Sequence, residues 1–144
     1  MLKVEELSKS FRTEEIETIA LNKVSFEVQQ GEFVAVMGPS GCGKSTLLNI
    51  LGLLDNPTSG QYFLLGKEVG TLKERDRTLY RKGKIGFVFQ AYNLVPVLSV
   101  WENIVLPIQL DGAKVDRAYV EEVIATLGLE KKLTNLPNQL SGGQ

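Results

Sequence analysis

GPSGCGKS, at residues 38–45, lies between a short apolar run and a segment with helical periodicity. The apolar run, FVAVM at residues 33–37, is typical of a buried parallel strand. Leucine and isoleucine recur at helical spacing over residues 44–54. A loop of the form G-x-x-x-x-G-K-S between a strand and a helix is the pattern of a phosphate-binding loop. The arrangement predicts an α/β core that binds nucleotide phosphates.

Each position of this loop has a physical role. Glycines let the backbone curl so that successive N–H groups face one centre, and the helix start adds a positive field. Lys44 supplies a point charge for the β- and γ-phosphates, the Ser45 hydroxyl is a ligand for Mg²⁺, and Thr46 serves the α-phosphate. A glycine-rich turn without a ligand is the alternative, and the flanking strand and helix argue against it. The predicted ATP-binding residues are Gly38, Pro39, Ser40, Gly41, Cys42, Gly43, Lys44, Ser45 and Thr46.

Other nucleotide folds fit this sequence poorly. Residues 41–46 begin like the dinucleotide pattern G-x-G-x-x-G but end in threonine. The chain has neither the N-K-x-D nor the D-x-x-G motif of a GTPase. A helix N-terminus can lower a thiol pKa, so a redox role for Cys42 is one hypothesis. A small residue tolerated in the loop is the favoured interpretation.

The remaining pattern alternates strands with helices. We expect antiparallel strands early in the chain, which form a layer beside the α/β core. Asp116 is a predicted helix cap, Gly128 a predicted stop and Pro107 a predicted disruption. The expected strands are residues 2–7, 20–28, 61–65 and 84–90, and the expected helices are residues 72–82, 100–110 and 116–127.

Composition narrows the possible functions. The 144 residues carry a net charge of −1, which gives no argument for nucleic acid, and the basic residues at 73–84 fit a solvated helix face better than a binding patch. Without histidine, the commonest general base and zinc ligand are absent. One cysteine allows no intrachain disulfide and suits a reducing cytoplasm. Residues 1–10 show no secretory signal and no segment has the ~20 apolar residues of a membrane span, so membrane work requires a partner.

Three motifs together resemble the ATP-binding cassette (ABC) ATPases: GPSGCGKS, a glutamine after the apolar strand at residues 84–90, and LSGGQ at residues 140–144. Residues 31–60 and 84–107 resemble the macrolide-export and lipoprotein-release branch. The resemblance implies an α/β P-loop NTPase core with a parallel sheet, an antiparallel β layer and the start of a helical subdomain. The implied parts are residues 1–30 for the β layer, 31–90 for the core, and 91–144 for the glutamine loop and partial helical subdomain.

The resemblance also implies roles for single residues. Phe11 would stack on adenine, or it is an ordinary core residue. Gln90 would contact Mg²⁺ and the attacking water, or it is a polar strand end. The implied catalytic residues are Lys44 and Gln90. The implied metal ligands are Ser45 and Gln90. The signature would cross a dimer to the γ-phosphate of the other copy's ATP, or it is a glycine-rich tail. The implied signature residues are Ser141, Gly142, Gly143 and Gln144.

The implied partners are a second copy of the ATPase subunit and transmembrane permease subunits, which would hold the protein at the cytoplasmic face of the cell membrane. Residues 91–98 would be the coupling surface for the permease; burial in the helical subdomain is the alternative. The implied function couples ATP binding and hydrolysis to export or release of a substrate. A soluble ABC ATPase of the repair or translation type is disfavoured by the continuous match over residues 84–107.

The family's strand ending in Asp-Glu, its dimer loop and its switch histidine have no counterpart in this sequence. LGLLD at residues 51–55 and the segment 108–111 are not credible substitutes, because the first lies on the helix after the loop and the second adjoins Pro107. We therefore expect a truncated chain with an exposed sheet edge and very weak hydrolysis. The alternative function is a non-catalytic ATP-binding fragment with no transport role of its own.

Overall fold

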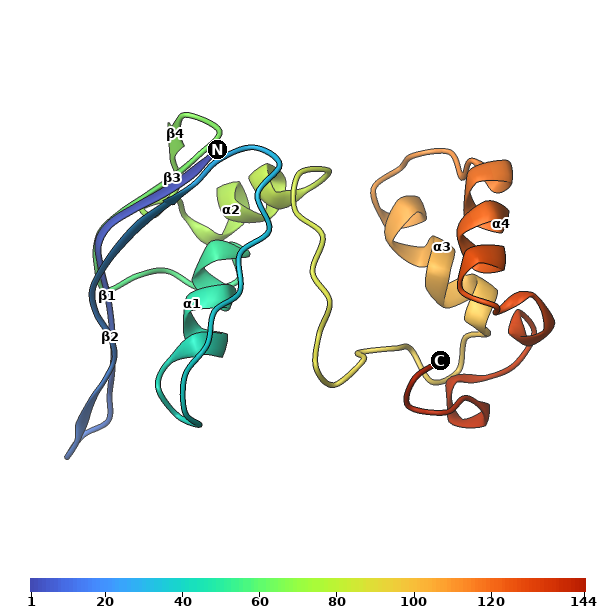
Figure 1. Ribbon diagram of the computed structural model, residues 1–144, viewed down its shortest axis with the longest axis horizontal. Coiled ribbons are helices and arrows are strands. Elements are labelled where there is room, and N and C mark those ends of the chain that lie inside the picture. Colours follow the sequence, from blue (N-terminus) through green and yellow to red (C-terminus); the bar gives the residue numbers. More distant parts are fainter. The chain divides into compact units, whose positions relative to one another are not determined.

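The computed structural model describes residues 1–144 as two compact units, residues 1–87 and 88–144 (Figure 1). The first unit contains β1 (Leu2–Arg12), β2 (Glu17–Val28), α1 (Lys44–Leu51), β3 (Ser59–Leu64), β4 (Lys67–Glu68) and α2 (Glu74–Arg81). The second contains α3 (Val100–Leu110), α4 (Arg117–Thr126) and single 3₁₀ turns at Glu130–Lys132 and Pro137–Gln139. No helix is both long enough and apolar enough to cross a bilayer.

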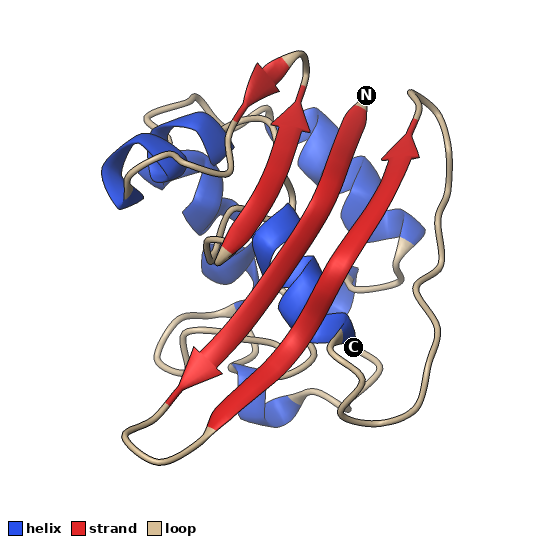
Figure 2. Cartoon of the chain, turned by 90° about the vertical axis from the view of Figure 1, so that its left-hand side faces the viewer, coloured by secondary structure: helices blue, strands red, loops and turns tan.

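The predicted antiparallel layer is a four-stranded sheet in the order β2-β1-β3-β4 (Figure 2). β1 pairs with β2 on one side and with β3 on the other, and every pairing is antiparallel. The layer is larger than the expected residues 1–30, because β3 and β4 come from the segment after α1. Those two strands complete the surface on which the loop helix packs.

A bulge in β1 lets two inward residues lie an odd number of positions apart. Val4 and Leu7 are both buried, and the pairing register shifts between them. Glu6, the extra residue, has a positive φ of 46°, and its N–H donates to the Ser25 hydroxyl at 2.8 Å. A Cβ at Gly60 would lie 2.4 Å from the Glu6 carbonyl oxygen, so only glycine fits opposite the bulge.

The core of the first unit forms where α1 covers the sheet. Leu47 and Ile50 of the helix pack with buried strand residues, among them Leu7 and Tyr62. The Tyr62 hydroxyl donates to the carbonyl of Leu51 at 2.7 Å, which satisfies its one polar atom. Burial raises the pKa of Tyr62, so the phenol stays neutral. This packing fixes α1, and with it the loop that precedes α1.

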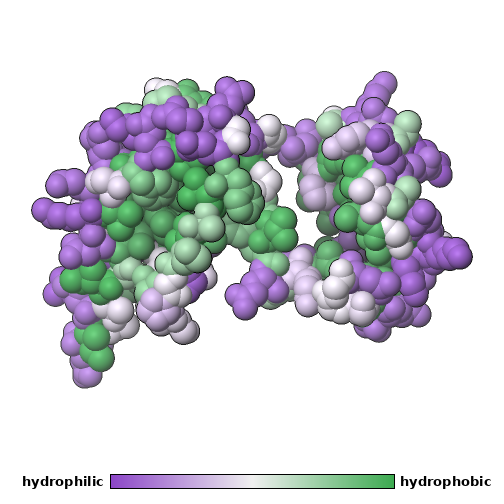
Figure 3. All heavy atoms as spheres, in the orientation of Figure 1, coloured by the Kyte–Doolittle hydropathy of each residue, from purple (hydrophilic) through white to green (hydrophobic).

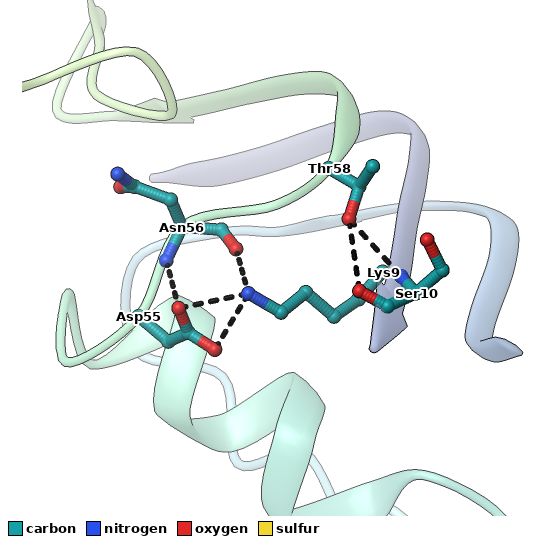
Figure 4. Close-up of polar contacts among 5 residues, drawn as sticks. All are labelled: Lys9, Ser10, Asp55, Asn56 and Thr58. Atoms are coloured by element: carbon teal, nitrogen blue, oxygen red, sulfur yellow. Dashed lines mark hydrogen bonds and ion pairs between the residues drawn. The ribbon is translucent and has the colours of Figure 1, made fainter. Parts of the chain in front are cut away.

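A polar cluster joins β1 to the chain that leaves α1 (Figure 4). Lys9 Nζ contacts both carboxylate oxygens of Asp55 at 2.8 Å and donates to the Asn56 carbonyl at 2.8 Å. Thr58 Oγ1 accepts from the Ser10 N–H at 3.0 Å, and the Thr58 N–H donates to the carbonyl of Ser8 at 2.8 Å. The helix after the loop is therefore tied at its far end to the sheet.

Two segments predicted as parallel strands, residues 32–37 and 84–90, are not strands in this structure. A strand forms only where a neighbouring strand supplies ladder hydrogen bonds, and the sheet in this structure consists of β1, β2, β3 and β4. The apolar side chains of residues 32–37 stay accessible: Phe33 is 97% and Met37 is 88% exposed. Figure 3 shows apolar residues gathered on this side of the first unit. The parallel part of the predicted sheet is therefore absent from residues 1–144.

Helix ends in the second unit follow local sequence signals. Ser99 and Glu102 form a reciprocal capping box at the start of α3. The side chain of Asp116 caps α4 as predicted by accepting from the Tyr119 N–H, and Gly128 follows α4 with a φ of 67°. The predicted disruption at Pro107 is wrong, because α3 continues to Leu110. Proline removes one N–H donor there, whereas packing of α3 against α4 around Val105 and Ile124 holds the remainder.

We expect Asp55→Asn to make the free energy of unfolding less dependent on pH in the acid range. Burial raises the pKa of Asp55, but hydrogen bonds from Lys9 and from the Asn56 N–H, with the Lys9 charge, more than offset it, so the pKa is lowered. Its stabilising effect is present above the ordinary value of 3.8 and is lost as pH falls through the lower folded-state value. Urea midpoints by far-UV circular dichroism, at neutral pH and near pH 3, measure this. Glu14→Gln, at an exposed turn carboxylate, is the control; equal pH slopes in wild type and Asp55→Asn would contradict the prediction.

Candidate nucleotide site

Lys44 is folded back over the glycine-rich loop. Its Nζ donates to the carbonyl oxygens of Gly38 at 3.1 Å and Pro39 at 3.0 Å, and the side chain is half-buried. A lysine ammonium is a compact charge on a flexible stem. In this position the ammonium supplies positive charge beside the loop, in addition to the backbone N–H groups of the loop.

Glycine is required at two positions of the loop. Gly41 and Gly43 have φ values of 78° and 77°, in the left-handed region that side chains disfavour. A Cβ at Gly43 would lie 2.0 Å from the carbonyl oxygen of Ala20, whereas a Cβ at Gly41 would meet no atom within 4 Å. The end of the loop is thus pressed against β2. This contact fixes where α1 begins.

The first turn of α1 presents donors and no acid. Gly43 is the N-cap and makes no side-chain capping bond, and the turn contains no Asp or Glu. The first N–H groups of a helix have no intrahelical partner, and its N-terminus carries partial positive charge. The Ser45 hydroxyl is exposed and Thr46 is half-buried. Backbone N–H groups, an ammonium and hydroxyls without a nearby carboxylate in that turn make a donor set suited to phosphate, and the serine oxygen is the ligand type that Mg²⁺ prefers.

Phe11 lies near the end of β1 and is 47% exposed, which excludes the core-residue alternative. Lys9 Nζ lies 5.1 Å from the centre of its ring. An accessible aromatic face can stack on a flat base, so the adenine role stays a prediction. Cys42 is also exposed, and a Cβ at Gly38 would lie 2.6 Å from its Sγ.

Gln90 and the signature belong to the second unit, whereas the loop belongs to the first. Gln90 is exposed and is followed by an apolar, accessible stretch. Tyr92 is 65% and Val97 is 79% exposed, so these two side chains do not enter the helical core, whereas Val95 and Leu98 are half-buried. Clustered apolar exposure of this kind is typical of an interaction surface.

Asn103 of α3 holds the turn at the end of this stretch. Its Oδ1 accepts from the Val95 N–H at 2.8 Å, and its Nδ2 donates to the carbonyls of Val95, Leu98 and Ser99 at 3.1, 3.0 and 3.0 Å. No sequence pattern pointed to this residue. An asparagine within a helical pattern gives no local signal of a tertiary contact.

The signature residues at 141–144 form a small closed turn. The Ser141 N–H donates to Gln144 Oε1 at 3.0 Å, and the Gln144 N–H donates to the Ser141 carbonyl at 3.0 Å. All four residues are exposed. The turn therefore presents its backbone and serine hydroxyl at the surface, where a second molecule could reach them.

An antiparallel layer, a helix started by a glycine loop and a lysine folded over that loop define a P-loop nucleotide-binding fold of the α/β class. The family model described as ABC transporter matches residues 21–144. The chain belongs to the ABC transporter family.

Known relatives and a solved structure support this family assignment. The uncharacterized ABC transporter ATP-binding protein MJ1508 of Methanocaldococcus jannaschii is 40% identical over 148 residues, covering 100% of this chain and 65% of the relative. The macrolide export ATP-binding/permease protein MacB of Bdellovibrio bacteriovorus is 40% identical over 146 residues, covering 100% of this chain and 22% of the relative. A dimeric structure of the ATP-binding cassette MJ0796 in a post-hydrolysis state with ADP and Pi matches with a TM-score of 0.89 and 39% identity, over 100% of this chain and 65% of that one.

These comparisons confirm the predicted family, the branch resemblance and the P-loop fold. The chain spans less than two thirds of the length of these relatives. The assignments of single residues to phosphate, adenine, magnesium or signature contacts stay predictions.

We expect Gly43→Ala to be far more harmful than Gly41→Ala. Both variants require a left-handed conformation that costs an L-residue roughly 1–2 kcal/mol. Only Gly43→Ala also drives a Cβ into the Ala20 carbonyl, so we expect a loss of about 3 kcal/mol or more in unfolding free energy. Urea denaturation measured by far-UV circular dichroism tests this, with Gly41→Ala as the matched control. Equal losses would show that the loop does not depend on contact with β2.

We expect Asn103→Ala to lower the unfolding free energy of the second unit by about 1–3 kcal/mol, because backbone groups of the 95–99 turn lose their partners. Trp101 is the only tryptophan and lies in this unit, so its fluorescence reports unfolding there. Asn138→Ala, at an exposed 3₁₀ position, is the control and should stay within about 0.5 kcal/mol of wild type. An equal effect of both substitutions would refute the pinning role.

Proposed function

We propose that the chain is the nucleotide-binding part of an ABC ATPase that drives export or release of a substrate through membrane subunits. The observation that carries the proposal is the loop itself: Lys44 folded over Gly38 and Pro39, at the start of a helix with no acidic residue in its first turn. The family membership and the relatives named above support it.

Different residues of the chain would bind different parts of the nucleotide. The loop N–H groups and Lys44 bind and orient the β- and γ-phosphates, and Thr46 serves the α-phosphate. Phe11 offers an aromatic face to the base, and its exposure supports this role. Mg²⁺, when bound, would neutralise charge on the phosphates. The exposed Ser45 hydroxyl would hold it, and the resemblance gives Gln90 a contact with the same ion.

We propose that residues 1–144 alone hydrolyse ATP very slowly. Phosphoryl transfer depends on groups that position the attacking water and the developing charge. This sequence contains no apolar strand ending in Asp-Glu. Gln90 is then the one residue to which the resemblance gives a contact with water.

We propose two protein partners. A second copy would place its signature against this chain's ATP; the related cassette MJ0796 is described as dimeric with ADP and Pi, which supports this. Permease subunits would contact the exposed apolar residues of segment 91–98, and the relative MacB is described as an ATP-binding/permease protein. Such contacts would hold the chain at the cytoplasmic face of the membrane.

The second candidate is a non-catalytic ATP-binding fragment. Segments 32–37 and 84–90 are not strands in this structure, which favours it, because a catalytic α/β core needs both as strands in register. Turnover in the presence of a membrane partner separates the two candidates, since only the first gains activity.

We expect Lys44→Ala to weaken Mg²⁺-dependent ATP binding by tenfold or more, equivalent to about 1.4 kcal/mol, because the loop loses its one mobile charge. Equilibrium binding of a fluorescent ATP analogue measures this, with phosphate release followed in the same sample. Lys73→Ala, at an exposed lysine before α2, is the matched control and should bind as wild type does. Equal affinity of wild type and Lys44→Ala would reject the proposed site.

A further inference from the structure

We propose that Tyr92 is a positioning residue that links the exposed segment 91–98 to the signature turn at residues 141–144. The inference rests on the proposed function, in which segment 91–98 faces a membrane subunit and the signature faces the ATP of a second copy. Both elements belong to the second unit, so their contact is a property of one compact body.

The contact is specific to one glycine of the signature. A Cβ at Gly142 would lie 3.0 Å from the Tyr92 hydroxyl oxygen, whereas a Cβ at the adjacent Gly143 would meet no atom within 4 Å. The Tyr92 hydroxyl therefore lies close to Gly142, and a side chain at Gly142 would have to displace the phenol. A displacement of Tyr92 toward the turn would therefore bring its hydroxyl against the main chain of the signature.

The backbone around Tyr92 directs this contact. Tyr92 and Asn93 both adopt left-handed conformations, with φ values of 58° and 52°. Such conformations cost a non-glycine residue about 1–3 kcal/mol each and persist where the surroundings hold them. The Asn93 N–H donates to the Ala91 carbonyl at 2.6 Å, which closes the turn.

Support on the other side comes from Asn103. It fixes Val95, Leu98 and Ser99 to α3 through four hydrogen bonds, so the segment after Tyr92 has a rigid base. Residues 91–94 are the part of the segment that these bonds leave unpinned, and their side chains are exposed. A partner pressing on residues 91–94 would move the tight turn, and the phenol would transmit that movement to Gly142. The remainder of the segment would stay in place.

A double-mutant cycle in the full chain tests the contact. Gly142→Ala, at a position without a positive φ, brings its Cβ against the phenol, and Tyr92→Phe removes the oxygen that it meets. We expect the urea midpoint, read from Trp101 fluorescence, to fall in Gly142→Ala and to recover in the double variant. Gly143→Ala, the matched control, should not be rescued by Tyr92→Phe. Additive effects of Tyr92→Phe and Gly142→Ala would overturn the proposal.

A spectroscopic signature serves as the second measurement, and it remains available if Gly142→Ala fails to fold. In chain labelled with ¹⁵N-glycine, Tyr92→Phe should shift the Gly142 amide resonance and leave those of Gly112 and Gly128 in place. An unchanged Gly142 resonance would overturn the contact. Neither this measurement nor the cycle uses nucleotide, so failure of ATP binding in the Lys44 experiment and failure of this inference are separate results.

Turnover distinguishes positioning from a structural role. In the presence of its membrane partner, Tyr92→Phe should lower the kcat of the chain by about fivefold, the lower range of coupling between sites in proteins, while KM for ATP is unchanged. The reason is that the signature would act on the γ-phosphate of the other copy as charge develops, whereas the loop of this copy governs ATP affinity. An unchanged kcat, or a rise in KM without a fall in kcat, would overturn the positioning role.

Discussion

The phosphate-binding loop depends on the close approach of Gly43 to the carbonyl of Ala20. This approach places the start of α1 against β2, and the leucine and isoleucine side chains of α1 then fill the space over the sheet. The Lys9–Asp55 contact holds the chain just after the far end of the helix, so α1 is anchored to the same antiparallel layer at both ends. Without a glycine at this point, the helix could not begin where its N–H groups meet the loop.

This arrangement explains how the loop keeps its curve while the preceding apolar run has no strand partner. Most of its support comes from residues on its C-terminal side: helix packing, the Tyr62 hydrogen bond to Leu51, and the cluster around Asp55. Residues 33–37 add little, because their side chains are largely exposed. The hydrophobic effect therefore fixes α1, and α1 fixes the loop.

Local signals in the sequence predicted the features that local physics determines. The glycine loop, the helix at residue 44, the cap at Asp116 and the stop at Gly128 each depend on a few adjacent residues. The disruption predicted at Pro107 was wrong because packing of the whole helix outweighs one lost hydrogen bond. The parallel strands at 32–37 and 84–90 could not be judged from their own composition, since a strand exists only with a neighbour. Asn103 and the Tyr92–Gly142 contact were invisible for the same reason: they join residues that are separate in any local pattern.

The apolar segment 33–37, which is not a strand in this structure, also bears on ligand binding. If nucleotide binds best when residues 33–37 are ordered as a strand, its affinity is reduced by the fraction of molecules in which that strand is not formed. Any element that pairs with the strand then raises affinity without touching the nucleotide, and bound nucleotide favours pairing by the same factor. Exposure of Phe33 and Met37 adds a hydrophobic drive toward such pairing. Nucleotide binding and strand formation at residues 33–37 would then be thermodynamically linked, whereas the packing of α1 holds the loop from its C-terminal side.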